Sequence, residues 1–118
     1  MPVITSKVAQ IRAVFQEYKK ARHQIMALDI VNQCSLTKIS RNSENINWCR
    51  TIVKYTQTIL MHMSRESCEI ITHLYINELE AKQLNYSQSS FYLKHKKAVN
   101  EFITLMNLCP QVAERITY

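Results

Sequence analysis

The sequence contains no glycine and only two prolines, Pro2 and Pro110, in 118 residues. Average usage would give about eight glycines in a chain of this length. Tight β-hairpin turns and the phosphate-cradling loops of nucleotide-binding folds both depend on glycine, so the composition argues against either structure. The absence of glycine therefore predicts an all-α protein.

Long apolar runs and paired metal-ligand motifs are missing as well. No apolar segment approaches the roughly 18 residues that a membrane-spanning helix requires, and the first residues lack the pattern of a signal peptide. The cysteines include no C-x-x-C pair, and His62 or His73 beside one cysteine would not complete a zinc site. We therefore expect a cytoplasmic chain without membrane contact, metal or cofactor. Its cysteines are expected to be free, small and buried: Cys34, Cys49, Cys68 and Cys109.

Apolar side chains recur at the spacing of a helix along most of the chain. The expected helices cover residues 5–28, 45–62, 65–76, 78–84 and 88–106. Ser43 is placed to cap the second of them. The sequence thus predicts a five-helix single domain. Its parts are an N-terminal helix within 1–30, a Ser- and Asn-rich linker at 31–45, a helical domain at 46–106 and a C-terminal tail at 107–118.

Charge is unevenly distributed along the chain, whose 15 Lys and Arg outnumber 9 Asp and Glu to give a net charge of +6. Such a balance favours a polyanionic partner, with nucleic acid first. Residues 61–85 contain four glutamates and two basic residues, whereas 86–106 contain three lysines and one glutamate. The most acidic stretch is thus followed directly by a lysine-rich helix.

That lysine-rich helix begins after a break with its own sequence signals. Asn85 tolerates the left-handed conformation that a tight turn needs, and Ser87 is a favoured N-cap residue. A short helix at 78–84, a turn and a capped helix together predict a helix-turn-helix at 78–106, whose second helix enters the DNA major groove. The opposite side of this second helix is expected to face the core with Phe91, His95, Ala98 and Val99.

The expected DNA contacts come from the first turns of the second helix. Gln88 and Ser89 are suited to hydrogen bonds with base edges, and Lys96 and Lys97 to contacts with phosphates. The complete set of candidate DNA-binding residues is Gln88, Ser89, Ser90, Tyr92, Leu93, Lys94, Lys96 and Lys97.

Several short motifs of the chain occur together in one known family. Ile71–Tyr75 is an Ile-x-x-x-Tyr segment, Leu84–Ser87 a Leu-x-Tyr-Ser turn, and Lys96–Ala98 a Lys-Lys-Ala run before Phe102. With the opening segment VAQIRAVFQEYKKAR at 8–22, they resemble the ArpU family of phage transcriptional regulators, which is similar to RinA-type late-gene activators and to region 4 of sigma factors. The resemblance implies a DNA-binding regulator of phage or prophage late genes, for packaging and lysis, in the cytoplasm of a bacterial host.

Leu93 departs from the family pattern, in which a basic or polar side chain is usual at that place. An exposed leucine can contact a thymine methyl group, or it can belong to a surface that binds another protein. A small helical module that binds a host protein or RNA polymerase is therefore the alternative function. An enzyme is the least supported class, because Ser87 and His95 lie about 12 Å apart along one helix, too far for a nucleophile and its base.

The first helix carries an apolar stripe that has two explanations. Val8, Ile11, Phe15, Tyr18 and Ile25 lie near one side of a helix about 36 Å long. They pack into the core of one subunit, or they join two copies into the homodimer that helix-turn-helix proteins commonly form on DNA.

Overall fold

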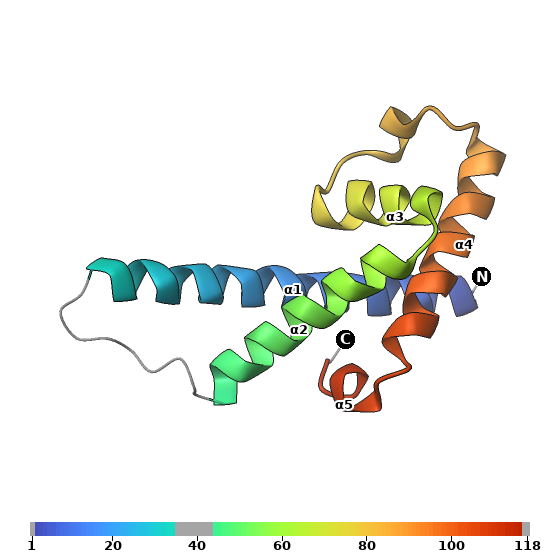
Figure 1. Ribbon diagram of the computed structural model, residues 1–118. Helices are drawn as coiled ribbons and strands as arrows, with labels where there is room; N and C mark the ends of the chain where they lie inside the picture. Colours follow the sequence, from blue (N-terminus) through green and yellow to red (C-terminus); the bar gives the residue numbers. More distant parts are fainter. Residues whose placement is uncertain (1, 35–43, 117–118) are drawn as a thin grey trace.

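The computed structural model describes residues 2–34 and 44–116, in which every regular element is helical (Figure 1). The five α-helices are Pro2–Cys34 (α1), Glu44–His62 (α2), Arg65–Ile71 (α3), Gln88–Met106 (α4) and Pro110–Ala113 (α5). A π-helical segment, Thr72–Ile76 (η1), follows α3, and a 3-10 turn, Ala81–Leu84 (η2), precedes α4. The all-α prediction is confirmed. Ser43, the expected cap of the second helix, lies outside the described residues.

The long helix α1 sets the shape of the molecule. Its 33 residues span about 50 Å at 1.5 Å per residue, which accounts for most of the longest dimension of 56 Å. Figure 1 shows α2 crossing α1 obliquely and α4 running past the N-terminal part of α1, where Lys7 donates a hydrogen bond of 2.8 Å to Asn100. The linker predicted from residue 31 onward is wrong for 31–34, which are helical. Leu28 and Asn32, one turn apart, are both buried, and this packing keeps the end of α1 helical.

One continuous apolar core joins α1, α2, α3 and α4. Phe15 of α1 meets Phe102 of α4 with ring centroids 5.0 Å apart, and Ile52 of α2 and Ile70 of α3 are fully buried in the same cluster. Three residues of the apolar stripe of the first helix, Ile11, Phe15 and Tyr18, are buried here. Val8 and Ile25 pack against the cluster from its edge. The stripe therefore forms the core of a single chain.

The C-terminal segment belongs to the fold: α4 ends at Met106, as the sequence predicts, but residues 107–116 pack back onto the core and are not a tail. Val112 and Ile116, four residues apart, are buried in the core cluster. The Arg115 guanidinium lies 4.3 Å from the centroid of the Trp48 ring, and Trp48 Nε1 donates a hydrogen bond of 2.9 Å to Glu17. Residues from α1, α2 and the end of the chain thus meet around the single tryptophan.

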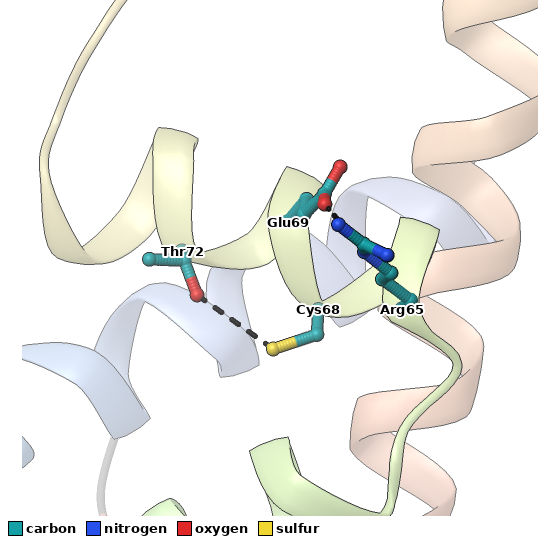
Figure 2. A network of polar contacts seen from close by, with 4 residues as sticks. All are labelled: Arg65, Cys68, Glu69 and Thr72. Atoms are coloured by element: carbon teal, nitrogen blue, oxygen red, sulfur yellow. Dashed lines mark hydrogen bonds and ion pairs between the residues drawn. The ribbon is translucent and has the colours of Figure 1, made fainter.

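The helix α3 is held mainly by burial, and the polar contacts within it are weak. Arg65 pairs with Glu69 at 3.3 Å, and Cys68 Sγ lies 3.9 Å from Thr72 Oγ1 (Figure 2). An exposed i,i+4 ion pair contributes only about 0.3–0.5 kcal/mol to the free energy of unfolding. Ile70 and Ile71, both at 0 % exposure, are therefore the main anchors of α3.

The four cysteines are free, as expected, but they are not uniformly buried. Cys49 is buried, and its Sγ lies 2.9 Å from Gln24 Oε1. Burial raises the pKa of the Cys49 thiol, and the carboxylate of Glu17 adds to this rise. Cys68 and Cys109 are half-buried, and Cys34, at the exposed end of α1, contradicts the prediction of burial.

A buried hydroxyl on α2 gives a direct stability prediction. Thr56 Oγ1 is buried without a hydrogen-bond partner among the described residues. Since an unsatisfied buried hydroxyl is destabilising, Thr56→Val should raise the free energy of unfolding by about 1 kcal/mol, measured by urea denaturation. On the same helix, exposed Thr58 donates a hydrogen bond of 2.7 Å to the Lys54 carbonyl, and Thr58→Val serves as the matched control. A loss of stability in Thr56→Val would show that the hydroxyl is satisfied.

Candidate nucleic-acid interface

The start of α4 has the local structure that the sequence predicts. Asn85 is in the left-handed conformation, with φ 62° and ψ 28°. Ser87 has extended dihedral angles, and its Oγ accepts a hydrogen bond of 3.2 Å from the Ser90 backbone N–H. These two residues stop the preceding turn and fix where α4 begins.

The segment before α4 differs from the expected helix at 78–84. Only Ala81–Leu84 is helical, as one 3-10 turn, and Glu78 has a positive φ of 54°. Leu79 is 45 % exposed, so of the two leucines of this segment only Leu84 packs against the core. In this segment Glu78 pairs with Lys19 at 3.3 Å and Glu80 pairs with Lys82 at 3.0 Å. The helix that packs across α4 is α3 instead.

The exposed side of α4 presents most of the expected DNA-contacting residues. Ala98, Val99 and Phe102 are at 0 % exposure on the other side, which fixes the rotation of the helix. Ser90 is half-buried next to the cap. Four side chains, from Gln88, Ser89, Tyr92 and Leu93, line a shallow depression of about 550 Å³. The exposed members of the predicted set are Gln88, Ser89, Tyr92, Leu93, Lys96 and Lys97.

The three lysines of α4 are not equivalent. Lys94 Nζ donates a hydrogen bond of 2.9 Å to Glu66 Oε2 on α3 and lies 5.2 Å from the centroid of the Tyr86 ring. The hydrogen bond to Glu66 raises the pKa of the Lys94 ammonium. Lys96 and Lys97 are exposed, and neither has an ion-pair partner in residues 2–34 and 44–116. The uncompensated positive charge of α4 therefore lies at Lys96 and Lys97.

Phe91 and His95 face inward from α4 but do not enter the core. Both are half-buried, and their rings stack with centroids 5.3 Å apart. His95 Nε2 lies 2.7 Å from the Tyr75 hydroxyl, and the donor depends on the tautomer of the imidazole. Burial raises the pKa of Tyr75 to about 12 and lowers the pKa of His95, and the Arg12 charge also lowers the pKa of His95. Sequence periodicity missed this contact, because Tyr75 and His95 belong to different helices.

The lowered pKa of His95 predicts a pH dependence of stability. The unfolded chain, with a histidine pKa of about 6.5, binds a proton more tightly than the folded chain does. The contribution of His95 is therefore complete above about pH 6.5 and is lost as the pH falls toward the lower folded-state value. His95→Gln should flatten the change in the free energy of unfolding between pH 7 and pH 5. His23→Gln, at an exposed position on α1, is the control and should leave that change intact.

The cap at Ser87 is testable apart from any binding. Ser87→Ala removes the hydrogen bond to the Ser90 N–H and should lower the free energy of unfolding by about 1 kcal/mol in thermal or urea melts. Ser89→Ala, two residues later on the exposed side, makes the same chemical change without touching the cap. An equal loss in both variants would contradict the capping role.

Comparison with known proteins found no relative of this chain: no family model, no curated protein and no solved structure matches it. Within residues 2–34 and 44–116, none of the helices has the length and apolar character needed to cross a membrane. The same residues hold no group of three or more His, Cys, Asp and Glu side chains that could bind a metal ion.

Proposed function

We propose that the protein binds double-stranded DNA through the exposed side of α4 and thereby regulates transcription. The observation that supports this most is the combination, on one rigid helix, of hydrogen-bonding side chains in the first turn and uncompensated lysines two turns later. Gln88 and Ser89 are exposed at the capped end, and Lys96 and Lys97 follow on the same helix. The buried residues of α4 hold this arrangement in place.

The proposal assigns a different role to each part of α4. The Gln88 amide can pair bidentately with adenine, a contact that discriminates between bases by about 1–3 kcal/mol. Lys96 and Lys97 lie about 12 Å further along the helix axis and would contact phosphates, which supply affinity without sequence preference. Lys94 keeps its ion pair with Glu66 and so positions α3 against α4. In this proposal α3, which packs across α4, supports the recognition helix, although η1 and residues 77–87 join the two helices in place of the short turn of a helix-turn-helix.

A regulatory role at phage or prophage late genes completes the proposal. It is supported by the resemblance to the ArpU family, which the motifs at Ile71–Tyr75, Leu84–Ser87 and Lys96–Ala98 carry. The last of these motifs is also the part of the exposed helix that bears the uncompensated charge.

The test is the salt dependence of binding to a random 20-base-pair duplex, followed by fluorescence anisotropy. Release of counterions from two phosphate contacts alone lowers affinity about 12-fold between 50 and 200 mM salt. We expect at least this change, and selection from random DNA should then enrich one short motif. Absence of binding at 50 mM salt would overturn the proposal.

The exposed apolar residues of α4 favour a second candidate function, in which this surface binds a protein. Leu93 is 65 % exposed and Tyr92 47 %, side by side on the depression at the start of α4. Purified bacterial RNA polymerase is the partner to test, by surface plasmon resonance, with Leu93→Ser as the disrupting variant and Leu108→Ser as the matched control. Leu108 is 72 % exposed outside α4, so its loss should leave such binding unchanged.

A homodimer would have to use a surface other than the apolar stripe, since Ile11, Phe15 and Tyr18 are buried within one chain. Large apolar side chains that are exposed on α1 include Met26, Ile30 and Val31, near its C-terminal end. Sedimentation velocity of the intact chain, alone and with Ile30→Glu, measures whether two copies join there. A monomer at tens of micromolar, free and on DNA, would remove the dimer from the proposal.

A further inference from the structure

A cavity of about 330 Å³ lies between α1, η1 and α4, formed by other residues than those that line the depression at the start of α4. Phe15 and Tyr75 supply its apolar wall, with ring centroids 6.1 Å apart and ring planes inclined by 14°. Its volume is at the lower end of the range of sites for small molecules, which is about 300–1,000 Å³. A wall of two nearly parallel rings suits a flat apolar group.

The rim of the cavity carries one net positive charge. Lys19 pairs with Glu78 at 3.3 Å, so these two charges offset each other. Arg12 also lines the cavity, and its side chain has no ion-pair partner in the described part of the chain. Its guanidinium lies close enough to Tyr75 and His95 to act on both electrostatically. A single guanidinium can donate two parallel hydrogen bonds to one carboxylate, and the two charges offset each other.

The backbone around the cavity has two irregularities of the kind found at binding sites. Thr72–Ile76 is π-helical, and such segments are frequent at functional sites. Glu78, which closes the rim, adopts a positive φ of 54°, a conformation that is uncommon for a residue other than glycine. Regular α-helix through this segment would place Tyr75 and Glu78 differently, so the irregular backbone is what brings both side chains to the cavity.

From this arrangement we infer that the cavity binds a small monoanion with a flat apolar body, its carboxylate on Arg12 and its body against the rings of Phe15 and Tyr75. The Tyr75–His95 pair supplies a neutral hydrogen-bonding group beside the carboxylate. A dianion such as a phosphate ester matches less well, because the rim offers only one uncompensated cation. The site stands apart from the proposed DNA contacts, and its test needs no DNA.

Benzoate and 2-naphthoate are the probes, and titration followed by ¹H–¹⁵N NMR at constant ionic strength is the measurement. We expect at least one acid to saturate in the millimolar range or below, with shifts centred on the amides of Phe15, Tyr75 and His95. Ligands of about ten non-hydrogen atoms commonly reach such affinities. Benzamide, which has the same ring without the charge, should bind at least fivefold more weakly than benzoate.

Arg12→Gln should weaken binding of the acid at least tenfold, while Arg22→Gln, at another exposed arginine of α1, should change it less than twofold. Arg12 is exposed, and an NMR spectrum of the free variant that changes only near position 12 will show that its fold is intact. The inference is overturned if neither acid gives saturable shifts up to 50 mM. It is also overturned if benzamide binds as well as benzoate, or if Arg12→Gln binds as well as the unaltered chain.

Discussion

Replacing Phe102 by alanine should lower the free energy of unfolding by about 3–5 kcal/mol. Phe102 is fully buried, and its ring packs against Phe15, so it joins α4 to α1 at the centre of the core. Its removal leaves a cavity that helices on several sides cannot close. Urea denaturation followed by circular dichroism will measure the loss.

Phe91→Ala on the same helix is the matched control for the size of the side chain. The sequence pattern placed Phe91 in the core, but Phe91 is only half-buried and stacks on His95 at the edge. Its replacement should therefore cost clearly less than that of Phe102. Equal losses from the two changes would mean that α4 is rotated relative to the structure described above.

The double change Lys96→Ala/Lys97→Ala should weaken binding to DNA of any sequence by about 60-fold at 0.1 M salt, if each lysine contacts one phosphate. The slope of log affinity against log salt concentration should become shallower by about two. Both effects follow from the position of these lysines on the exposed side of α4 without a carboxylate partner among the described residues. Anisotropy titrations at four salt concentrations give the affinity and the slope together.

Lys20→Ala/Lys54→Ala removes the same charge from exposed positions on α1 and α2. It should change the slope by well under one unit, because only contacts with phosphate release counterions. A loss confined to the selected DNA site would instead assign Lys96 and Lys97 to base recognition. Equal effects of the two double changes would show that net charge, and not α4, determines the affinity.

Local features of the fold were predictable from the sequence because their causes are local. The apolar spacing around Ile11 and Phe15 identified α1. Asn85 and Ser87 correctly predicted that α4 begins at Gln88. The ends of elements were less predictable, because tertiary packing decides them. Burial of Asn32 extends α1, and burial of Val112 folds the C-terminal segment back onto the core.

The candidate site was predictable in outline but not in its charges. The exposed positions on α4 followed from the helical period, yet Lys94 is neutralised by Glu66, 28 residues earlier in the chain. No local pattern reveals such a pair. The cavity beside Tyr75 was missed for the same reason, because its Arg12 and His95 come from opposite ends of the sequence. Only the acidic character of 61–85, next to a lysine-rich helix, hinted that some lysines would be compensated.

The packing of α1 against α4 has a consequence for how the chain folds in a cell. Lys7 and Asn100 lie 93 residues apart in sequence, and the ring of Phe15 packs against the ring of Phe102. At a synthesis rate of about 5–20 residues per second, α4 is synthesised about 5–20 s after the part of α1 on which it packs. During that interval the apolar residues of α1 that pack on α4 are exposed to solvent, and exposed apolar segments are what chaperones bind. Final folding must therefore follow synthesis of α4, and changes that slow the docking of α4 should reduce the yield of protein even where the folded state is unaltered.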